Sequence, residues 1–252
     1  MSESTLSTNY AELMNAVRVF LGYAPDDSSS DNEVNLYVQS GLRQFYYPCA
    51  VEGVDPGFEW SFMKPTATLN TVVNDAEYDL PDDLGRVIGC FHFEPNIHIR
   101  PIPLVSEAMI LSRQQTSLIA GVPVMAAVRP KDSTGADGQR YEVVFWPTPS
   151  AVYTMTYRYE AYANKISATH PYPLGGMKHS ELLLESCLAI AEQRANDEAG
   201  VHTEKFNRML ITATRRDLKN GATTYGNMGQ PDDSYQMESR STGVITYKGL
   251  TL

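Results

Sequence analysis

The chain has 252 residues, with 20 Lys and Arg against 30 Asp and Glu, which gives a formal net charge of −10. A hydrophobic fraction of 42% with 10% aromatic residues predicts a packed globular protein and excludes an intrinsically disordered one. No apolar run reaches the roughly 18–20 residues of a membrane helix, so we expect no membrane-spanning segment.

The acidic balance disfavours a protein that wraps nucleic acid tightly, because that function needs clustered Lys and Arg. The acid is concentrated in residues 1–60, which carry nine acidic side chains against Arg18 and Arg43. Three widely spaced cysteines form no C-x-x-C pair and are interpreted as buried thiols of a reducing compartment: Cys49, Cys90 and Cys187. The first residues lack the basic and apolar regions of a secretory signal.

Two amphipathic helices are predicted at the start of the chain. Asn9 and Glu12 have the spacing of a capping box, and Gly22 is the expected end of the helix that follows. Ser30 and Glu33 predict a second capping box, and this second helix should end before Pro48. Its apolar stripe is expected to comprise Val34, Tyr37, Val38, Gly41, Leu42 and Phe45.

Residues 51–164 have a period of two and predict an antiparallel β region. In its clearest strand, 151–161, alternation places Tyr153, Met155, Tyr157 and Tyr159 on one face. We expect YEVVFW (141–146) to be its hairpin partner, and RVIGCFHF (86–93), apolar on both faces, to be buried on both sides. A short helix is predicted over 104–115 and a turn over 131–139.

Helices return over 177–220, with Gly200 as the expected break between two of them. Segment 221–240 has almost no aliphatic residue and should not pack by itself. The final GVITYKGLTL (243–252) predicts one strand without a partner in its own segment, so it is either a disordered tail or a strand added to another subunit's sheet edge. The candidate partner-binding residues are Tyr235, Val244, Ile245, Tyr247 and Leu250.

No catalytic or metal-binding motif is found, and we expect no enzyme and no cofactor. His92 alternates with Ile88 and Cys90 and is interpreted as a hydrogen-bonded core histidine. The Gly175–Gly176 pair either allows a tight approach of loop to helix or binds an anion at a helix start. A cluster of carboxylates is interpreted as an acidic turn between strands: Asp75, Glu77, Asp79, Asp82 and Asp83. A cluster of basic residues is interpreted as a solvated helix face: Arg208, Arg215, Arg216 and Lys219.

Taken in order, several segments resemble the head-to-tail connector, or adaptor, proteins of tailed bacteriophages. They are QFYYP, Trp60-Ser-Phe, EYDLPDDLGRVIG, VVFWPTPSAVYTMTYRYEAYANKI, YPLGGMKHSELLLESCLAIAEQRANDE and EKFNRMLITATRRD, within residues 10–220. The resemblance implies an α+β fold: a helical bundle formed by N- and C-terminal helices, with an inserted antiparallel β domain and an extended C-terminal arm. The corresponding ranges are 1–50, 51–165, 166–220 and 221–252.

The resemblance also implies a structural virion protein that is assembled in the host cytoplasm. It would form a ring, usually of twelve subunits, below the portal protein and join the capsid to a tail or nozzle protein at the head–tail interface. DNA would pass through the channel at genome ejection without tight binding, and the C-terminal arm would reach the portal.

The alternative is a carbohydrate- or ligand-binding β module of a tail component, with Trp146 and the tyrosines of 151–161 as an exposed aromatic platform. A hydrolase is the third hypothesis, although no residue constellation supports it.

Overall fold

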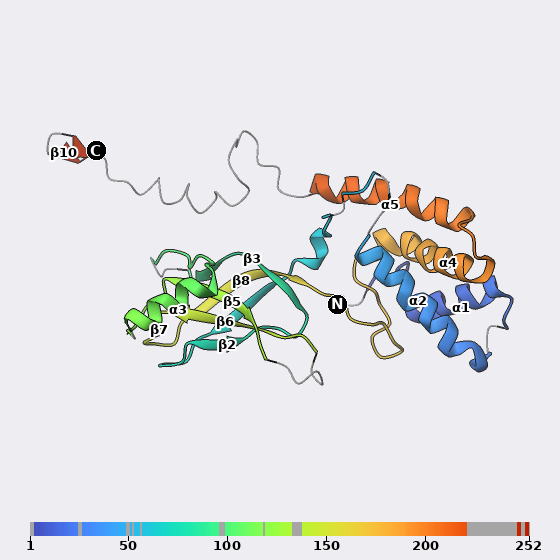
Figure 1. The fold of residues 1–252 in the computed structure, drawn as a ribbon. Coiled ribbons are helices and arrows are strands. Elements are labelled where there is room, and N and C mark those ends of the chain that lie inside the picture. Colours follow the sequence, from blue (N-terminus) through green and yellow to red (C-terminus); the bar gives the residue numbers. More distant parts are fainter. Residues whose placement is uncertain are drawn as a thin grey trace. The chain divides into compact units, whose positions relative to one another are not determined.

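The computed structural model describes residues 3–24, 27–48, 51, 53–55, 57–95, 99–117, 119–132 and 138–220, together with the backbone of 246–247 and 250–251. The chain divides into two compact units: unit 1, Met1–Lys64 with Tyr162–Ala222, and unit 2, Pro65–Ala161 with Thr223–Leu252. Unit 1 is helical and the strands lie in unit 2 (Figure 1), so the predicted α+β class is confirmed.

The α-helices of unit 1 come from the two ends of the described chain and pack as a bundle (Figure 1). They are α1 (Tyr10–Leu21), α2 (Asp31–Tyr46), α4 (Ser180–Asn196) and α5 (Val201–Asn220). Short 3-10 turns lie at Ser28–Ser30, Ser61–Met63 and Met177–His179. Helix α4 contacts each of the other three, and its Leu183 and Cys187 are completely buried.

The predicted capping box of α1 is confirmed. The Asn9 side chain accepts a hydrogen bond from the Glu12 amide at 3.0 Å, and the Glu12 carboxylate accepts one from the Asn9 amide at 3.1 Å. Gly22 ends the helix with φ +79°, a conformation that a residue without Cβ adopts at no steric cost.

The predicted capping box at the start of α2 is wrong. The Ser30 hydroxyl donates to the Asp27 carbonyl at 2.9 Å instead of capping the helix, and the Glu33 carboxylate accepts from the hydroxyls of Tyr23 and Tyr37. The physical reason is the 3-10 turn before α2. Its own cap is Asp27, whose carboxylate accepts from the Ser29 amide, and this turn makes the chain helical before Ser30 can act as a cap.

Helices α2 and α4 approach each other closely at Gly41. A Cβ placed on Gly41 would lie 2.7 Å from Cα and 2.8 Å from N of Cys187, and the Ser186 hydroxyl donates to the Gly41 carbonyl at 2.7 Å. Burial raises the pKa of the Cys187 thiol to about 12, which keeps it protonated at this contact. Only a glycine permits this crossing.

A buried carboxylate joins α4 to α5. The Glu192 side chain accepts from the amides of Gly200, His202 and Thr203 at 3.1–3.2 Å, so its negative charge lies at the positive end of α5. Two turns earlier in α4, the Glu185 carboxylate accepts a hydrogen bond from the His202 ring at 2.7 Å. The predicted break at Gly200 is confirmed, and Glu192 fixes the connection that this break creates.

Unit 2 has two three-stranded antiparallel sheets that enclose one core. The first sheet has the order β1 (Thr66–Asn70), β8 (Thr154–Ala161), β3 (Leu84–Phe93), and the second has the order β2 (Glu77–Asp79), β6 (Tyr141–Trp146), β5 (Met125–Pro130). A short parallel pair is formed by β4 (Ala120–Gly121) and β7 (Thr148–Pro149). Helix α3 (Glu107–Thr116), which confirms the helix predicted over 104–115, packs on β5 and β6 through Ile110.

The alternation predicted for 151–161 is confirmed. Met155, Tyr157 and Tyr159 of β8 are buried in the core between the sheets, whereas Arg158 is exposed. Hydrogen bonds extend the β1–β8 ladder by one residue at each end, since the Tyr159 amide donates to the Pro65 carbonyl and the Thr71 amide to the Tyr153 carbonyl. The inserted unit therefore begins and ends on adjacent strands.

The predicted hairpin between 141–146 and 151–161 is wrong. Strand β6 pairs with β2 and β5, and β8 pairs with β1 and β3 in the other sheet. The reason lies in the connection, where Pro147 and Pro149 have no amide hydrogen to continue a ladder. Thr148 and Pro149 instead pair with β4, and the chain changes sheet there.

The predicted double burial of 86–93 is also wrong. Strand β3 lies at the end of its sheet, with Arg86 and His92 exposed. The strand that is buried on both faces is β6: Val143 and Phe145 face the core between the sheets, and Val144 faces α3. The sequences of β3 and β6 are both apolar runs, and only the position of each strand in its sheet decides whether one face or both faces are buried.

Two further predictions concern the loops and the C-terminal end. The Lys131 amide donates to the Arg140 carbonyl at 2.9 Å and closes the β5–β6 hairpin, although 133–137 of the turn predicted over 131–139 lie outside the described residues. Instead of one strand, the C-terminal segment forms two short paired strands, β9 (Thr246–Tyr247) and β10 (Leu250–Thr251). Of the candidate partner-binding residues, Tyr247 and Leu250 pair in this ribbon, and Tyr235, Val244 and Ile245 lie outside the described residues.

The close approach at Gly41 is testable. Replacing Gly41 by Ala should destabilise the protein by about 1–3 kcal/mol, because the methyl group must displace the backbone of Cys187. Helix propensity alone predicts that Gly41→Ala raises the free energy of unfolding by about 0.5–1 kcal/mol. A decrease would therefore show that the close packing outweighs helix propensity. Urea unfolding followed by far-UV circular dichroism measures it. Gly57→Ala is the control, because its Cβ would meet only the Asp55 side chain at 3.6 Å; equal stability of G41A and the wild type would contradict the packing.

Candidate functional site

Three of the six segments that carry the resemblance to phage adaptors meet in one aromatic cluster of unit 1, formed by Phe45, Trp60, Phe62 and His179. The Phe45 and Trp60 ring centroids are 4.9 Å apart, and the His179 ring lies 5.0–5.7 Å from the three others. Sequence analysis did not predict this cluster. The sequence feature that could have indicated the cluster is the position of aromatic residues at the ends of predicted helices, just before or after a loop.

Hydrogen bonds fix the cluster to the backbone of three segments. The Trp60 indole donates to the Phe45 carbonyl at 2.9 Å, and the Tyr46 hydroxyl donates to the Leu174 carbonyl at 3.3 Å. Burial raises the pKa of Tyr46 above its usual value, which keeps its hydroxyl a donor. The end of α5 is attached as well, because Asp217 accepts from the amide and hydroxyl of Ser61 at 2.8 and 2.6 Å.

The glycine pair before α4 serves the same packing. Gly175 has φ +107°, and a Cβ there would lie 3.2 Å from the Phe62 ring. Gly176, with φ +64°, has the Glu3 carboxylate 3.5 Å from the place of a Cβ. A carboxylate beside the pair opposes the binding of an anion there, so the tight approach of loop to helix is the interpretation that the geometry supports.

The core position predicted for the His92 imidazole is wrong, because His92 is exposed, whereas the half-buried His179 packs its ring into the aromatic cluster. Burial lowers the pKa of His179, with a smaller raising effect from Asp217 and smaller lowering effects from Lys178 and Arg216. Within the described residues its buried Nδ1 has no hydrogen-bond partner. The imidazole therefore acts as a neutral aromatic ring.

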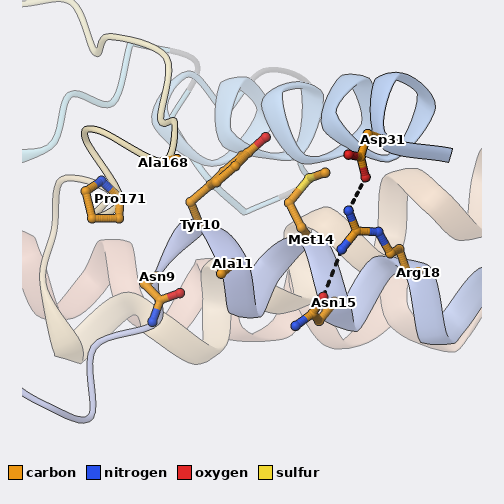
Figure 2. A pocket seen from close by; sticks show the side chains of 9 residues that line it. All are labelled: Asn9, Tyr10, Ala11, Met14, Asn15, Arg18, Asp31, Ala168 and Pro171. Carbon is orange, nitrogen blue, oxygen red and sulfur yellow. Dashed lines mark hydrogen bonds and ion pairs between the residues drawn. The ribbon is translucent and has the colours of Figure 1, made fainter. Parts of the chain in front are cut away.

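A pocket of about 360 Å³ lies beside α1 (Figure 2). Its lining residues are Asn9, Tyr10, Ala11, Met14, Asn15, Arg18, Asp31, Ala168 and Pro171. Arg18 is ion-paired with Asp31 and donates to Asn15, and the Tyr10 hydroxyl donates to Asn35 at 3.2 Å. The charged groups of the pocket neutralise one another, and none of its nine lining residues forms a nucleophile–base pair.

The acidic residues of the N-terminal segment are largely occupied within the fold. Asp31 pairs with Arg18, Glu59 with Lys64, and Glu33 accepts from two tyrosines. In contrast, Arg208, Arg215, Arg216 and Lys219 are all exposed on α5, as expected for a solvated helix face. Among the described side chains, no carboxylate lies within ion-pair distance of these four.

Three of the five carboxylates of the acidic turn of unit 2 form ion pairs with cations of β5 and the β5–β6 hairpin. Glu77 pairs with Arg129 at 2.8 Å, Asp79 with Lys131 at 2.6 Å, and Asp82 with Arg140 at 3.4 Å. In the part of the chain that the structure describes, no three His, Cys, Asp or Glu side chains are placed to bind a metal ion. Over the same residues, no helix has the length and apolar character needed to cross a membrane.

The exposed aromatic platform of the alternative hypothesis is contradicted by burial. Tyr157 and Tyr159 are 3% and 8% exposed, so their rings are core and cannot stack on a sugar. Trp146 packs with Ile110 beside α3, on the other side of the second sheet from the tyrosine face.

The half-buried His179 predicts a pH dependence of stability. Its pKa in the folded state lies below the unfolded value of about 6.5, so its contribution is fully present above pH 6.5 and is lost as the pH falls below that value. His179→Gln should flatten the decrease in unfolding free energy between about pH 7 and pH 5.5. Urea titrations at several pH values measure this slope. His92→Gln is the control for an exposed imidazole, and an unchanged slope in H179Q would contradict the assignment.

The family comparison agrees with this geometry. The family model of the SU10 adaptor protein matches residues 8–228, a range that includes α1 to α5 and β1 to β8. No curated protein matches the chain. Because the match extends over both the helical bundle and the β unit inserted into it, the chain belongs to the SU10 adaptor protein family.

Proposed function

We propose that this protein is a head-to-tail adaptor of a tailed bacteriophage. In this proposal it forms a ring, dodecameric as in the connectors that it resembles, below the portal protein, joins the capsid to the tail or nozzle, and lines the channel for DNA exit. It acts without catalysis or a cofactor, at the head–tail interface of the virion. The observation that carries the proposal is the family match over residues 8–228.

The charge of the chain supports a channel that does not hold DNA. A ring of twelve copies would carry a formal charge of about −120, which would repel a duplex and let it slide. The exposed cations of α5 are too few to reverse this balance. Tight binding of phosphates is therefore not part of the proposed function.

The C-terminal arm, 221–252, supplies the proposed partner contacts through Tyr235, Val244, Ile245, Tyr247 and Leu250. Its apolar and β-branched residues are gathered at the very end, after a polar stretch, as in segments that add a strand to another protein. The partner is the portal or a neighbouring copy of the chain.

The first test is the mass of the purified protein in solution by light scattering, alone and after mixing with the cognate portal. The adaptor proposal expects one discrete complex in which a ring of copies is bound to the portal. A protein that remains a monomer and ignores the portal would contradict the proposal.

The second test removes the arm. Deletion of 221–252 should abolish docking to the portal, because the arm carries the proposed strand contacts, and should leave the circular dichroism spectrum of the folded units intact. Co-sedimentation with the portal measures docking. Docking that persists unchanged in the deletion variant would show that the arm is not the contact.

A further inference from the structure

Strand β1 is an open sheet edge. In the β1–β8 ladder, the hydrogen bonds at Pro65 and Thr71 direct the odd-numbered residues of β1 toward β8. The amides and carbonyls of Thr66, Thr68 and Asn70 therefore point away from β8. Within the described residues β1 has a strand neighbour on one side only, so this row of backbone groups is free to pair.

The other three edges of the two sheets are partly covered, or short and charged. Strand β3 exchanges backbone hydrogen bonds with Ile102 at Phe91, and β5 is covered at Ala126 by residues 103–105. Strand β2 is only three residues long and carries the ion-paired Glu77 and Asp79. Charges, short length and covering loops are the devices by which proteins prevent an edge from pairing. The sequence of β1, TATLN, has no charge and no proline.

A groove lies along this open edge. Its volume is about 400 Å³, within the range of pockets that bury a ligand, and it is lined by 67–70 of β1 on one side and 78–81 on the other, with Tyr157. Leu69, Leu80 and Tyr157 are buried and give the groove an apolar floor. A strand added here would gain backbone hydrogen bonds from β1 and could place every second side chain on that floor.

The C-terminal ribbon, formed by β9 and β10, has no third strand among the described residues. Strands β9 and β10 have two residues each and pair only with each other among the described strands. An isolated two-stranded ribbon is marginal in water, and a third strand stabilises it. Val244 and Thr246 alternate with Ile245 and Tyr247, so an extended segment offers an apolar side chain to the groove in either orientation.

We propose that the open edge of β1 in one copy receives the C-terminal strands of a second copy. Among the described strands β1 and the ribbon do not pair with each other, and the 25 residues of 221–245 can span up to roughly 85 Å to reach another copy. The proposal rests on the proposed function, because a ring brings the edge of one copy within reach of the arm of the next. Each copy then gives one ribbon and accepts one, which closes a heterologous ring.

Amide hydrogen exchange of the full-length protein tests the contact directly. Exchange in the peptide that contains 66–70 should slow at least about tenfold when the ring forms, and should remain fast in the dilute monomer. Protection that is equal at all concentrations would mean that the chain's own ribbon fills the edge and would overturn the proposal. Assembly with no protection of 66–70 would overturn it as well and would leave the adaptor function standing.

Two proline variants test whether the contact joins different copies. Thr68→Pro removes an outward amide without breaking the β1–β8 ladder, and Thr246→Pro removes a backbone donor from the ribbon. Each variant alone should assemble at least about tenfold less than the wild type, as measured by light scattering with the portal present. A mixture of the two should form complexes of two copies, because T68P supplies ribbons and T246P supplies open edges. Each such pair keeps one blocked edge and one blocked ribbon, so the mixture should not close a ring.

The matched control is Thr68→Val, which keeps the amide and should assemble like the wild type. Circular dichroism and thermal unfolding check the fold, and if T68P does not fold, T246P still blocks the same contact from the other side. Normal assembly of T246P, or of a folded T68P, would overturn the proposal and leave the adaptor function intact. A wild-type protein that never assembles, even with the portal, would overturn the adaptor function itself.

Discussion

The contact between α2 and α4 at Gly41 is the constraint on which the architecture depends. Gly41 and Ser186 are 145 residues apart in sequence, yet a hydroxyl–carbonyl bond of 2.7 Å joins them, with Cys187 completely buried beside it. A close crossing of this kind closes a long loop of chain, and its entropic cost must be offset by the packing of the whole bundle. The aromatic cluster at the ends of the same helices supplies part of that packing, since Phe45 lies in the last turn of α2 and His179 precedes α4. Because Gly41 and Ser186 lie on either side of residues 65–161 in the sequence, this contact also closes the chain around the inserted unit.

Local patterns in the sequence predicted the elements well where one interaction decides the structure. The Asn9–Glu12 box and the alternation of Met155 and Tyr157 depend only on neighbours in the chain, and both were confirmed. Predictions failed where a distant partner decides. The apolar runs 86–93 and 141–146 look alike, and only their places in the sheets make one exposed on one face and the other buried on both. Ser30 failed for a local reason, because a 3-10 turn with its own cap precedes α2.

The candidate site was predictable only in part, and for a related reason. No motif marks the cluster of Phe45, Trp60 and His179, because its members come from segments that no local periodicity connects. Histidine shows this most clearly: alternation predicted His92 to be the buried imidazole, whereas the ring contacts and the lowered pKa belong to the half-buried His179, in the 3-10 turn before α4. The carboxylates 75–83 were predicted to form an acidic turn, and three of them form ion pairs with cations of β5 and the β5–β6 hairpin.

The pairing of the first and last strands of unit 2 has a consequence for how such proteins diversify. Because Pro65 and Tyr159 are hydrogen-bonded neighbours, the chain leaves the bundle and returns to it through a two-stranded stem. A module attached by such a stem can be lengthened, shortened or exchanged without any change in the spacing between α2 and α4. Selection on the bundle and selection on the β unit are thereby separated within one gene. The surface of the β unit can evolve while the helical frame remains the same.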